Sequence, residues 1–427
     1  MPLPRRLILV KLAGSPESLR RQNRTNVLNC ILNHEAIDRT QLAVETGLTT
    51  TAITRITREL IDAGILETGE KAPLKSGPGR NRTQLTFTDD NTFVIGINFA
   101  AWERQMVLAN LKGEAIAYRP FELSNPQDSA QTLEEISHTV NTFIVEQKIK
   151  RNRILGVGFA IAGIVNSTAG RLESSPYLGW HDVEIGKILS DKLGLQVAVE
   201  NLNNIIAMAE TRYGCCANKK DMMLIRVGPG LGGSFLFDGK LARGDKFQAG
   251  QVGHIPVADN HILCACGQKG CLNTIASGWS ILADLNLSIP PASSPGRLVD
   301  DGLLLEDVIG RAQNGDEVVT AAAFRAGSAL GDMLTALYKA LAPEVVLVVG
   351  PIAEIGSYID GIQSAASNNK ITLPLFTPND QKFKSVASSA ALHGLSEFLF
   401  SPRLRLAELM PVSATLDHPY LSGEINP

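Results

Sequence analysis

Four potential metal ligands lie close together near the middle of this 427-residue chain, and no other feature limits its fold as strongly. They are His254, Cys264, Cys266 and Cys271. Three thiols and one imidazole form a complete tetrahedral set for zinc, which leaves no coordination position open for water. Gly267 and Gly270 permit the tight turns that bring several sulfur atoms to one ion. We therefore expect a structural Zn²⁺ ion at this point.

These cysteines could instead form a redox pair or be small buried side chains. One residue separates Cys264 from Cys266, whereas two residues separate the cysteines of a thioredoxin-type pair. The chain has 6 cysteines in all, and half of them lie here, which favours zinc. Cysteines grouped for a metal rather than spread for disulfide bridges favour a reducing, cytoplasmic location. We expect the remaining three, Cys30, Cys215 and Cys216, to be small buried residues.

This part of the sequence resembles the ROK family of repressors, open reading frames and kinases. The family pattern has glycine, an acid, any residue, glycine and histidine, and then Cys-x-Cys-Gly-x-x-Gly-Cys-Leu-Glu. The chain follows it from Gly250 to His254 and again from Cys264 to Asn273. Both family glutamates are amides here, namely Gln251 and Asn273. The resemblance extends over roughly residues 20–400.

Composition indicates a globular protein, because 44% of the residues are hydrophobic and 19% are charged. Near the start, the apolar run of residues 7–10 is too short for a signal peptide or a membrane span, so we expect no membrane insertion. Charge is uneven: residues 1–82 carry 13 Lys and Arg against 8 Asp and Glu, while the rest carry 27 against 35. A basic head on an acidic body is typical of a nucleic-acid-binding domain joined to another domain.

Residues 1–82 are expected to form a winged helix-turn-helix. Apolar residues at helical spacing predict helices over residues 21–33, 41–46 and 50–64. Asp38 is placed to begin the second helix, and Gly47 is placed to stop it. In the third helix, the residues at 53, 56, 60 and 61 are apolar and predict the buried face. An ordinary small helical bundle with a polar outer face is the alternative.

The opposite face of the third helix is polar near its start, and we expect it to enter the major groove of double-stranded DNA. The candidate contacts are Thr50, Thr51, Thr54, Arg55 and Arg58. Hydroxyl groups approach phosphates closely, and arginine binds guanine through two hydrogen bonds. Two strands, residues 65–67 and 84–87, are expected around a Gly- and Pro-rich wing, where Arg80 and Arg82 are further candidate DNA contacts. The pair Gly79 and Arg80 could equally be a hinge.

Residues 83–400 are expected to form a mixed α/β body. Predicted strands cover residues 93–99, 104–110, 115–118, 154–161 and 196–200, with helices over 132–147 and 183–193 and a loop through Gly163 and Gly170. The pattern begins again with a hairpin at 222–237 and a buried strand at 345–350. With the resemblance, this repetition implies two lobes of the actin, Hsp70 and sugar-kinase type. Residues 401–427 form a tail without a counterpart in the family.

The resemblance also implies what an active ROK kinase would need. The family motif Asp-x-Gly-Gly-Thr corresponds to Asn98 through Trp102 here, so the acid and both glycines are lost. In the motif Glu-Asn-Asp-Ala-Asn, Leu202 replaces the aspartate that would act as general base. Loss of a general base costs about 10²–10⁴ in rate. A second glycine-rich loop is kept in part at residues 228–233. We therefore expect that the chain is not an enzyme.

Sugar hydroxyls in the family are contacted at positions that correspond to Asn201, Gln251, His254 and Asn273. Tyr177 and Trp180 are expected at the entrance of the same cleft, either stacking on a sugar or packing as a lid. Amides donate one hydrogen bond as well as accept, unlike carboxylates. We therefore expect a phosphorylated, N-acetylated or acidic sugar, or a non-sugar effector, rather than a plain neutral aldohexose. The alternative is a vestigial pocket that binds nothing.

Taken together, the sequence predicts a cytoplasmic ROK-type transcriptional regulator, most simply a repressor, which binds DNA and senses a sugar or sugar derivative. A homodimer or homotetramer would place two recognition helices on a palindromic operator. A sugar kinase with atypical catalytic residues and an adaptor that binds another protein are the alternative functions.

Overall fold

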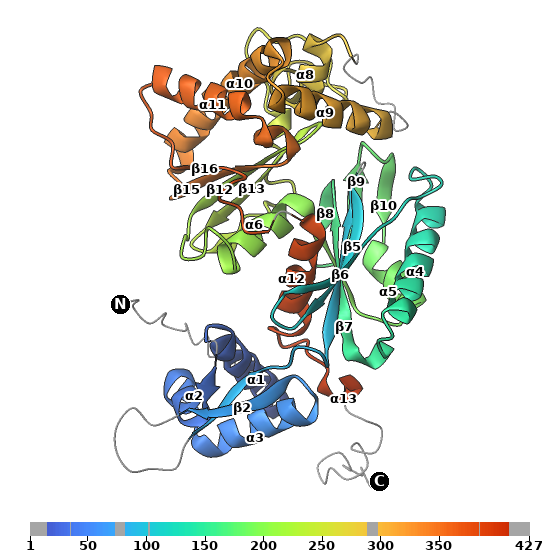
Figure 1. Ribbon diagram of the computed structural model, residues 1–427, viewed down its shortest axis with the longest axis vertical. Helices are drawn as coiled ribbons and strands as arrows, with labels where there is room; N and C mark the ends of the chain where they lie inside the picture. The colour runs from blue at the N-terminus through green and yellow to red at the C-terminus, as the bar shows by residue number, and fades with distance from the viewer. Residues whose placement is uncertain are drawn as a thin grey trace. The chain divides into compact units, whose positions relative to one another are not determined.

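The computed structural model describes residues 15–34, 36–72, 82–100, 103–287, 298–383 and 385–409, with the backbone alone for residues 70–72, 82 and 298–301. The chain divides into two compact units, and Figure 1 labels the elements of each. The first unit contains the described residues up to Thr92 and those from Leu395 onward, and the second is Phe93–Gly394. Among the described residues, no helix combines the length and the apolar character needed to cross a membrane.

The first unit is a winged helix-turn-helix. Its elements are α1 (Pro16–Leu32), β1 (Ile37–Asp38), α2 (Arg39–Thr46), α3 (Thr50–Asp62), β2 (Leu66–Ala72) and β3 (Arg82–Phe87). Asp38 begins α2 because its carboxylate accepts hydrogen bonds from the N–H groups of Thr40 at 2.7 Å and Gln41 at 3.0 Å. Gly47 ends α2 at φ 68°, a conformation that favours glycine.

The predicted three-helix arrangement is confirmed, although α1 and α2 each begin earlier than predicted. The core contains Val27, Leu28, Ile53, Ile56 and Leu60, none of them more than 1% exposed. The sheet has the order β1-β3-β2. Its short strand β1 was not predicted, because two residues are too few to show a pattern. The centre of the predicted wing, residues 73–81, lies outside the described residues.

The chain returns to the first unit near its end. Phe400 packs edge to face against Phe87 with ring centroids 5.8 Å apart, and Arg24 donates a hydrogen bond to the carbonyl of Leu404 at 2.9 Å. The sequence predicts a domain boundary after residue 82 and a separate tail over residues 401–427. The structure divides the chain at Thr92 instead, and it places residues 401–409, which include α13 (Leu406–Leu409), with the winged helix.

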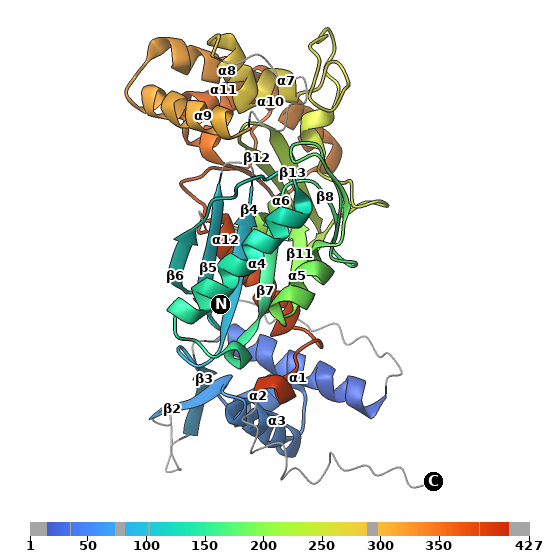
Figure 2. The same cartoon turned by 90° about the vertical axis from the view of Figure 1, so that its right-hand side faces the viewer.

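The first lobe of the second unit is a five-stranded sheet in the order β11-β7-β4-β5-β6. Its strands are β4 (Phe93–Phe99), β5 (Arg104–Asn110), β6 (Ala115–Pro120), β7 (Ile154–Ile161) and β11 (Val197–Asn201). As Figure 2 shows, α4 (Ser129–Glu146) and α5 (Ile185–Leu193) cover one face, and α12 (Val386–Phe398) covers the other. Gly96 and Gly158 face α12, since a Cβ on either would lie only 2.0 Å or 1.9 Å from a carbonyl oxygen of that helix.

The segment between β7 and α5 differs from the prediction of a loop through Gly163 and Gly170. The structure has a three-stranded antiparallel sheet here, in the order β10-β9-β8. Its strands are β8 (Ile164–Asn166), β9 (Arg171–Ser175) and β10 (Trp180–Val183), and the 3₁₀ turn η1 (Arg151–Arg153) precedes β7. These strands are short and mostly half-buried, so they show no apolar alternation that the sequence could reveal.

The second lobe repeats the plan of the first, with a five-stranded sheet in the order β14-β13-β12-β15-β16. The strands are β12 (Met222–Val227), β13 (Leu231–Phe237), β14 (Lys240–Leu241), β15 (Val345–Val349) and β16 (Leu375–Phe376). The helices are α6 (Leu202–Arg212), η2 (Val252–His254), α7 (Asn273–Ala276), α8 (Gly278–Asp284), α9 (Leu298–Gln313), α10 (Glu317–Leu341), η4 (Pro351–Glu354) and α11 (Gly356–Asn368). Both β4 and β12 pair with one antiparallel and one parallel neighbour, which confirms the predicted two-lobed α/β fold.

Candidate functional site

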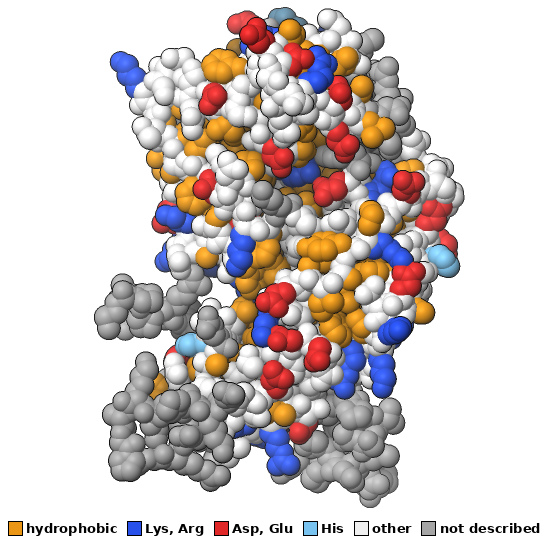
Figure 3. Space-filling view, in the orientation of Figure 1, with side chains coloured by type: hydrophobic (Ala, Val, Ile, Leu, Met, Phe, Trp, Pro, Cys, Tyr) orange, Lys and Arg blue, Asp and Glu red, His pale blue; other side chains and the backbone are white. Residues whose placement is uncertain are grey.

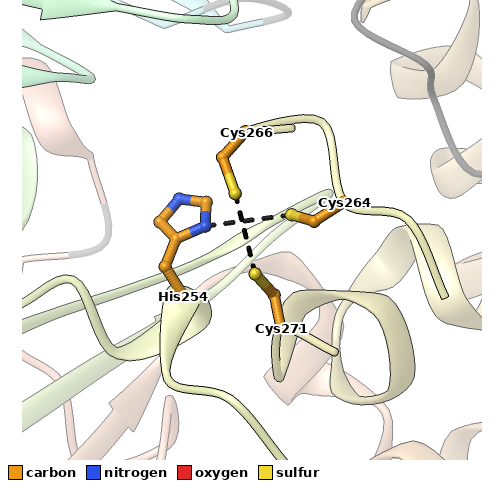
Figure 4. Close-up of side chains that lie close together, drawn as sticks. All are labelled: His254, Cys264, Cys266 and Cys271. Atoms are coloured by element: carbon orange, nitrogen blue, oxygen red, sulfur yellow. Dashed lines mark hydrogen bonds between the residues drawn. The ribbon is translucent and has the colours of Figure 1, made fainter. Parts of the chain in front are cut away.

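The four predicted metal ligands converge on one point in the second lobe (Figure 4). Their donor atoms all lie within 4.8 Å of one another. The Sγ atoms of Cys266 and Cys271 are 3.6 Å apart, and Nδ1 of His254 is 3.8 Å from Sγ of Cys264. Tetrahedral zinc with Zn–S bonds of about 2.3 Å separates its ligand atoms by about 3.8 Å. The donor set and its spacing therefore fit a four-coordinate metal.

Local backbone structure explains why these side chains meet. Gly267 and Gly270 adopt φ values of 88° and 84°, and the N–H of Cys264 donates to the carbonyl of Gln268 at 2.8 Å. His254 comes from the separate turn η2.

Burial lowers the pKa of His254, which keeps a lone pair available on its ring. Burial also raises the pKa of Cys271 to about 12, so a cation would be needed to hold that sulfur as a thiolate.

A cavity of about 160 Å³ lies beside this cluster, between the two lobes of the second unit. From the first lobe it is lined by the ends of β4, β7 and β9, and from the second lobe by the start of α6 and by residues 230–233, 249–251 and 254. Tyr177 and Trp279 also line it, with their ring centroids 5.3 Å apart. Nδ1 of His254 faces the sulfur cluster, so the ring can present Nε2 to the cavity that it lines.

The cavity brings together three of the four predicted ligand-binding residues. Asn201, Gln251 and His254 line it. The amide of Asn201 already donates to the carbonyl of Gly163 at 2.7 Å and caps α6 by accepting from the N–H of Asn203 at 2.8 Å. Asn273 is not among the lining residues: it is 2% exposed, and its oxygen accepts a hydrogen bond from the N–H of Leu231 at 2.6 Å. Asn273 therefore holds the loop between β12 and β13 in place and does not contact the cavity directly.

Several lining residues were missed by the sequence analysis. Arg226 is 8% exposed, and it lines both this cavity and a second cavity that Glu103 also lines. In the sequence, the signal for it was a single charged residue inside the apolar strand β12. Ser175 and Trp279 also line the cavity, and Ser175 Oγ and Trp279 Nε1 are buried without hydrogen-bond partners among the described residues. Buried polar atoms normally have hydrogen-bond partners, so these two atoms are exceptions within the site.

Trp180, which the sequence places at the cleft entrance together with Tyr177, lies in the core instead. It is 2% exposed, packs 5.4 Å from Phe99, and donates its indole N–H to the carbonyl of Pro126 at 3.0 Å. Of this predicted aromatic pair, only Tyr177 lines the cavity. Trp279, Phe99 and Phe247 are the other aromatic residues that line it.

The positions of the lost kinase residues are occupied by groups that cannot accept a proton from a substrate. Leu202 is 4% exposed and packs in an apolar cluster with Ile205 and Leu224. The neighbouring carboxylate, Glu200, is 0% exposed and is bound by Arg243 at 2.8 Å. Asn98, where the family has an acid, donates to the carbonyl of Glu103 at 3.1 Å. Ala101 and Trp102 lie outside the described residues.

In the winged helix, the five predicted contacts on α3 share one exposed face. Thr50, Thr51, Thr54, Arg55 and Arg58 are all exposed, with 62% of the Arg55 side chain and 83% of the Arg58 side chain accessible. Arg80 lies outside the described residues, and Arg82 is described only by its backbone in β3. On the face drawn in Figure 3, charges of both signs and apolar groups are interspersed wherever side chains are described. The five predicted contacts thus form one exposed polar face of α3.

Fold and site together define a two-lobed α/β body of the sugar-kinase type that is joined to a winged helix-turn-helix. The ROK family model matches residues 94–395, and a winged helix-turn-helix DNA-binding model matches residues 20–67. The chain belongs to the ROK family.

Relatives and a solved structure match most of the chain. The xylose repressor of Caldicellulosiruptor bescii is 27% identical over 339 residues, which cover 78% of this chain and 84% of the relative. The Escherichia coli DNA-binding transcriptional dual regulator NagC is 24% identical over 342 residues, which cover 80% of this chain and 83% of the relative. A crystal structure of a ROK family transcriptional regulator, homologous to the E. coli MLC protein, has the same fold. It has a TM-score of 0.72 at 22% identity and covers 92% of this chain and 99% of that chain.

Proposed function

We propose that this chain is a DNA-binding transcriptional repressor whose ROK body senses a sugar or sugar derivative without transforming it. One observation carries the proposal: the chain joins an exposed polar helix face to a cavity in which Leu202 occupies the place of the catalytic base. The names of the two relatives, a xylose repressor and NagC, support the same function.

DNA binding is assigned to the exposed face of α3. Arg55 and Arg58 lie on that face, and a guanidinium can form two hydrogen bonds with a guanine in the major groove. Thr50, Thr51 and Thr54 bring hydroxyls to the same side, where they suit phosphate oxygens. Arg80 and Arg82 are proposed as wing contacts. In a homodimer or homotetramer, two such helices would read a palindromic operator about one helical turn apart.

Effector binding is assigned to the cavity beside the metal cluster. Asn201, Gln251 and His254 supply donors and acceptors for hydroxyl groups, and the unpartnered Ser175 Oγ and Trp279 Nε1 add two more polar atoms. Tyr177 and Trp279 offer rings against which an apolar sugar face can pack. Asn273 acts indirectly in this proposal, because it holds the backbone of Leu231 at the edge of the cavity.

Structural Zn²⁺ is proposed for the cluster of His254, Cys264, Cys266 and Cys271. Four protein ligands close the coordination sphere, so the ion would supply cross-linking and orientation rather than Lewis-acid chemistry. The ring of His254 would then be fixed through Nδ1, with Nε2 directed to the ligand. The cluster would thereby set the angle at which His254 meets an effector.

Phosphoryl transfer is disfavoured by the side chains around Leu202. A substitute base would have to come from Glu200, but Glu200 is buried, is bound by Arg243 and also accepts from the N–H of Asn201 at 2.8 Å. An adaptor role is disfavoured because the body contains a cavity between its lobes whose size and mixed polar and apolar lining suit a small molecule. The repressor function explains both the cavity and the exposed face of α3.

Selection of genomic fragments by the purified chain, followed by anisotropy titration of the best fragment with and without candidate sugars, tests the proposal. We expect tight, sequence-selective binding that at least one sugar, sugar phosphate or N-acetylated sugar changes. Release of ADP from ATP with any of these sugars, or the absence of selective DNA binding, would contradict the proposed function.

A further inference from the structure

A second group of metal-binding side chains lies in the winged helix, far along the chain from the Cys₃His cluster. Cys30 is in the last turns of α1, His34 follows the end of that helix, and Glu45 is in α2. Their ligand atoms all lie within 4.8 Å of one another. Sγ of Cys30 is 3.3 Å from Oε2 of Glu45, and Nε2 of His34 is 3.3 Å from Oε1 of Glu45. Three different ligand types thus face one small volume.

The orientation of the His34 ring is set by the backbone. Its Nδ1 lies 2.8 Å from the carbonyl oxygen of Cys30. A carbonyl oxygen only accepts hydrogen bonds, so Nδ1 carries the proton and donates it. In the neutral ring Nε2 is then an acceptor, and it faces another acceptor, the carboxylate of Glu45. A cation between these two atoms resolves the conflict. A backbone carbonyl on the second ring nitrogen is also the usual support for a metal-binding histidine.

The carboxylate of Glu45 is held in place as well. Gln41, one turn earlier in α2, donates its side-chain N–H to Oε1 of Glu45 at 2.8 Å. The thiol of Cys30 reaches the other oxygen, Oε2. Support of this kind around a ligand reduces the side-chain entropy that binding an ion would otherwise cost. Both partners of the carboxylate therefore orient it toward the same volume.

We propose that Cys30 Sγ, His34 Nε2 and the Glu45 carboxylate form a second divalent-cation site, which takes Zn²⁺ or a similarly thiophilic ion and joins α1 to α2. Tetrahedral zinc with bonds of about 2.0 Å to N and O and 2.3 Å to S would separate N from O by about 3.3 Å and S from O by about 3.5 Å. The observed separations are 3.3 Å from Sγ of Cys30 to Oε2 of Glu45 and 3.3 Å from Nε2 of His34 to Oε1, so both oxygens of the carboxylate lie within reach of an ion at this point. A thiolate and an imidazole select against Mg²⁺ and Ca²⁺.

This site differs from the Cys₃His cluster in being open. Three protein ligands leave one position for water, and the thiol proton of Cys30 passes to solvent when the ion binds. The side chains of His34 and Glu45 are 27% and 37% exposed, so an ion can enter and leave. We therefore assign an exchangeable ion here. α2 leads through Gly47 into α3. A bound ion that joins α1 to α2 would therefore also help to hold α3 and its exposed face in position.

Metal titration of the chelator-stripped full chain tests the proposal directly. With Co²⁺ as a spectroscopic probe and Zn²⁺ as competitor, we expect two equivalents for the unaltered chain, the second bound more weakly. His34→Gln and Glu45→Gln should each remove the weaker equivalent and keep the tighter one. Cys30→Ser should remove its sulfur-to-cobalt charge-transfer band. His138→Gln, at an exposed histidine in α4, is the matched control and should keep both equivalents.

One equivalent in the unaltered chain would overturn the proposal and would mean that a proton, not a metal, lies between His34 and Glu45. Two equivalents in His34→Gln would overturn it as well. Circular dichroism of each variant checks that the chain remains folded, and His34 and Glu45 are exposed enough to be replaced without opening the core. The readout is metal stoichiometry, so its outcome is independent of whether the chain proves to be a repressor.

Discussion

The exposed face of α3 and the cavity of the body both gather polar side chains, but the two regions hold them in different ways. On α3, the Arg58 side chain is 83% exposed, and its nitrogen Nε lies 4.0 Å from the carboxylate of Asp62. In the body, Asn201 and Asn273 are bound to backbone groups at 2.7 Å and 2.6 Å. Exposed cations suit a partner that brings many negative charges, whereas ordered amides suit a small partner that brings hydroxyl groups. Mutations should therefore separate the two regions.

The largest effect is expected from Cys271→Ser, which removes a buried ligand of the Cys₃His cluster. Losing a structural metal should lower the melting temperature of the body by on the order of 10 °C and weaken any effector-induced shift. Zinc analysis and calorimetry of the full chain measure both. Cys216→Ala is the matched control, because Cys216 is equally buried but lies outside the cluster. An unchanged zinc content in Cys271→Ser would break the assignment.

The next largest effect is expected from Arg55→Ala combined with Arg58→Ala. Each arginine that contacts a base or phosphate contributes about 1–3 kcal/mol, so the pair should weaken operator binding by about 10²-fold. Fluorescence anisotropy at fixed salt measures the change. Arg325→Ala, an exposed arginine of α10, should leave DNA binding as it was. Effector binding should be unchanged in both variants, and its loss in the α3 variant would show that the two regions are not separable.

A smaller effect is expected from Trp279→Phe, which keeps an aromatic ring and removes the unpartnered N–H. One hydrogen bond is worth about 1 kcal/mol, so the effector should bind about fivefold more weakly while DNA binding without effector is retained. Calorimetric titration with the effector measures this. Ser175→Ala should behave alike. Ser357→Ala, whose buried hydroxyl also lacks a partner among the described residues but lies away from the cavity, should have no effect on affinity.

The smallest effect is expected from Thr49→Ala. The hydroxyl of Thr49 caps α3 by accepting from the N–H of Ala52 at 3.3 Å. Loss of a cap costs about 1 kcal/mol, so operator affinity should fall a few-fold through poorer ordering of the helix start. Thr142→Ala, at a half-buried threonine of α4 whose hydroxyl donates to the carbonyl of His138 at 3.0 Å, serves as control. Equal operator affinity for Thr49→Ala and the unaltered chain would show that the cap does not contribute to recognition.

Elements with a strong local signal were predicted closely from sequence. Strands β4 and β7 were predicted with their observed bounds, because both are unbroken runs of buried residues. The turn before α3 was located by Gly47, whose positive φ is needed there. The three-stranded sheet of β8, β9 and β10 was missed, since short strands that are half-buried carry no regular pattern.

Residues of the candidate sites were predictable only where their spacing along the chain carries the signal. The Cys₃His cluster is compact in sequence and was found, whereas Cys30 and Glu45 lie 15 residues apart on two helices and were not. Asn273 was expected to contact the ligand because it lies in the family motif that follows the last cysteine. Its burial, however, depends on tertiary packing, in which its side chain is hydrogen-bonded to the backbone of Leu231. Arg226 gave one charge in an apolar strand, and only the fold shows that it reaches two cavities.

The ion pair between Glu200 and Arg243 limits how a carboxylate could be accommodated at position 202. An aspartate at position 202 would enter a site that is 4% exposed and surrounded by aliphatic groups, so its charge would be heavily penalised. It would also stand two residues from the Glu200 carboxylate, whose compensating guanidinium is already engaged. Leu202→Asp alone is therefore expected to destabilise the body without supplying a usable base.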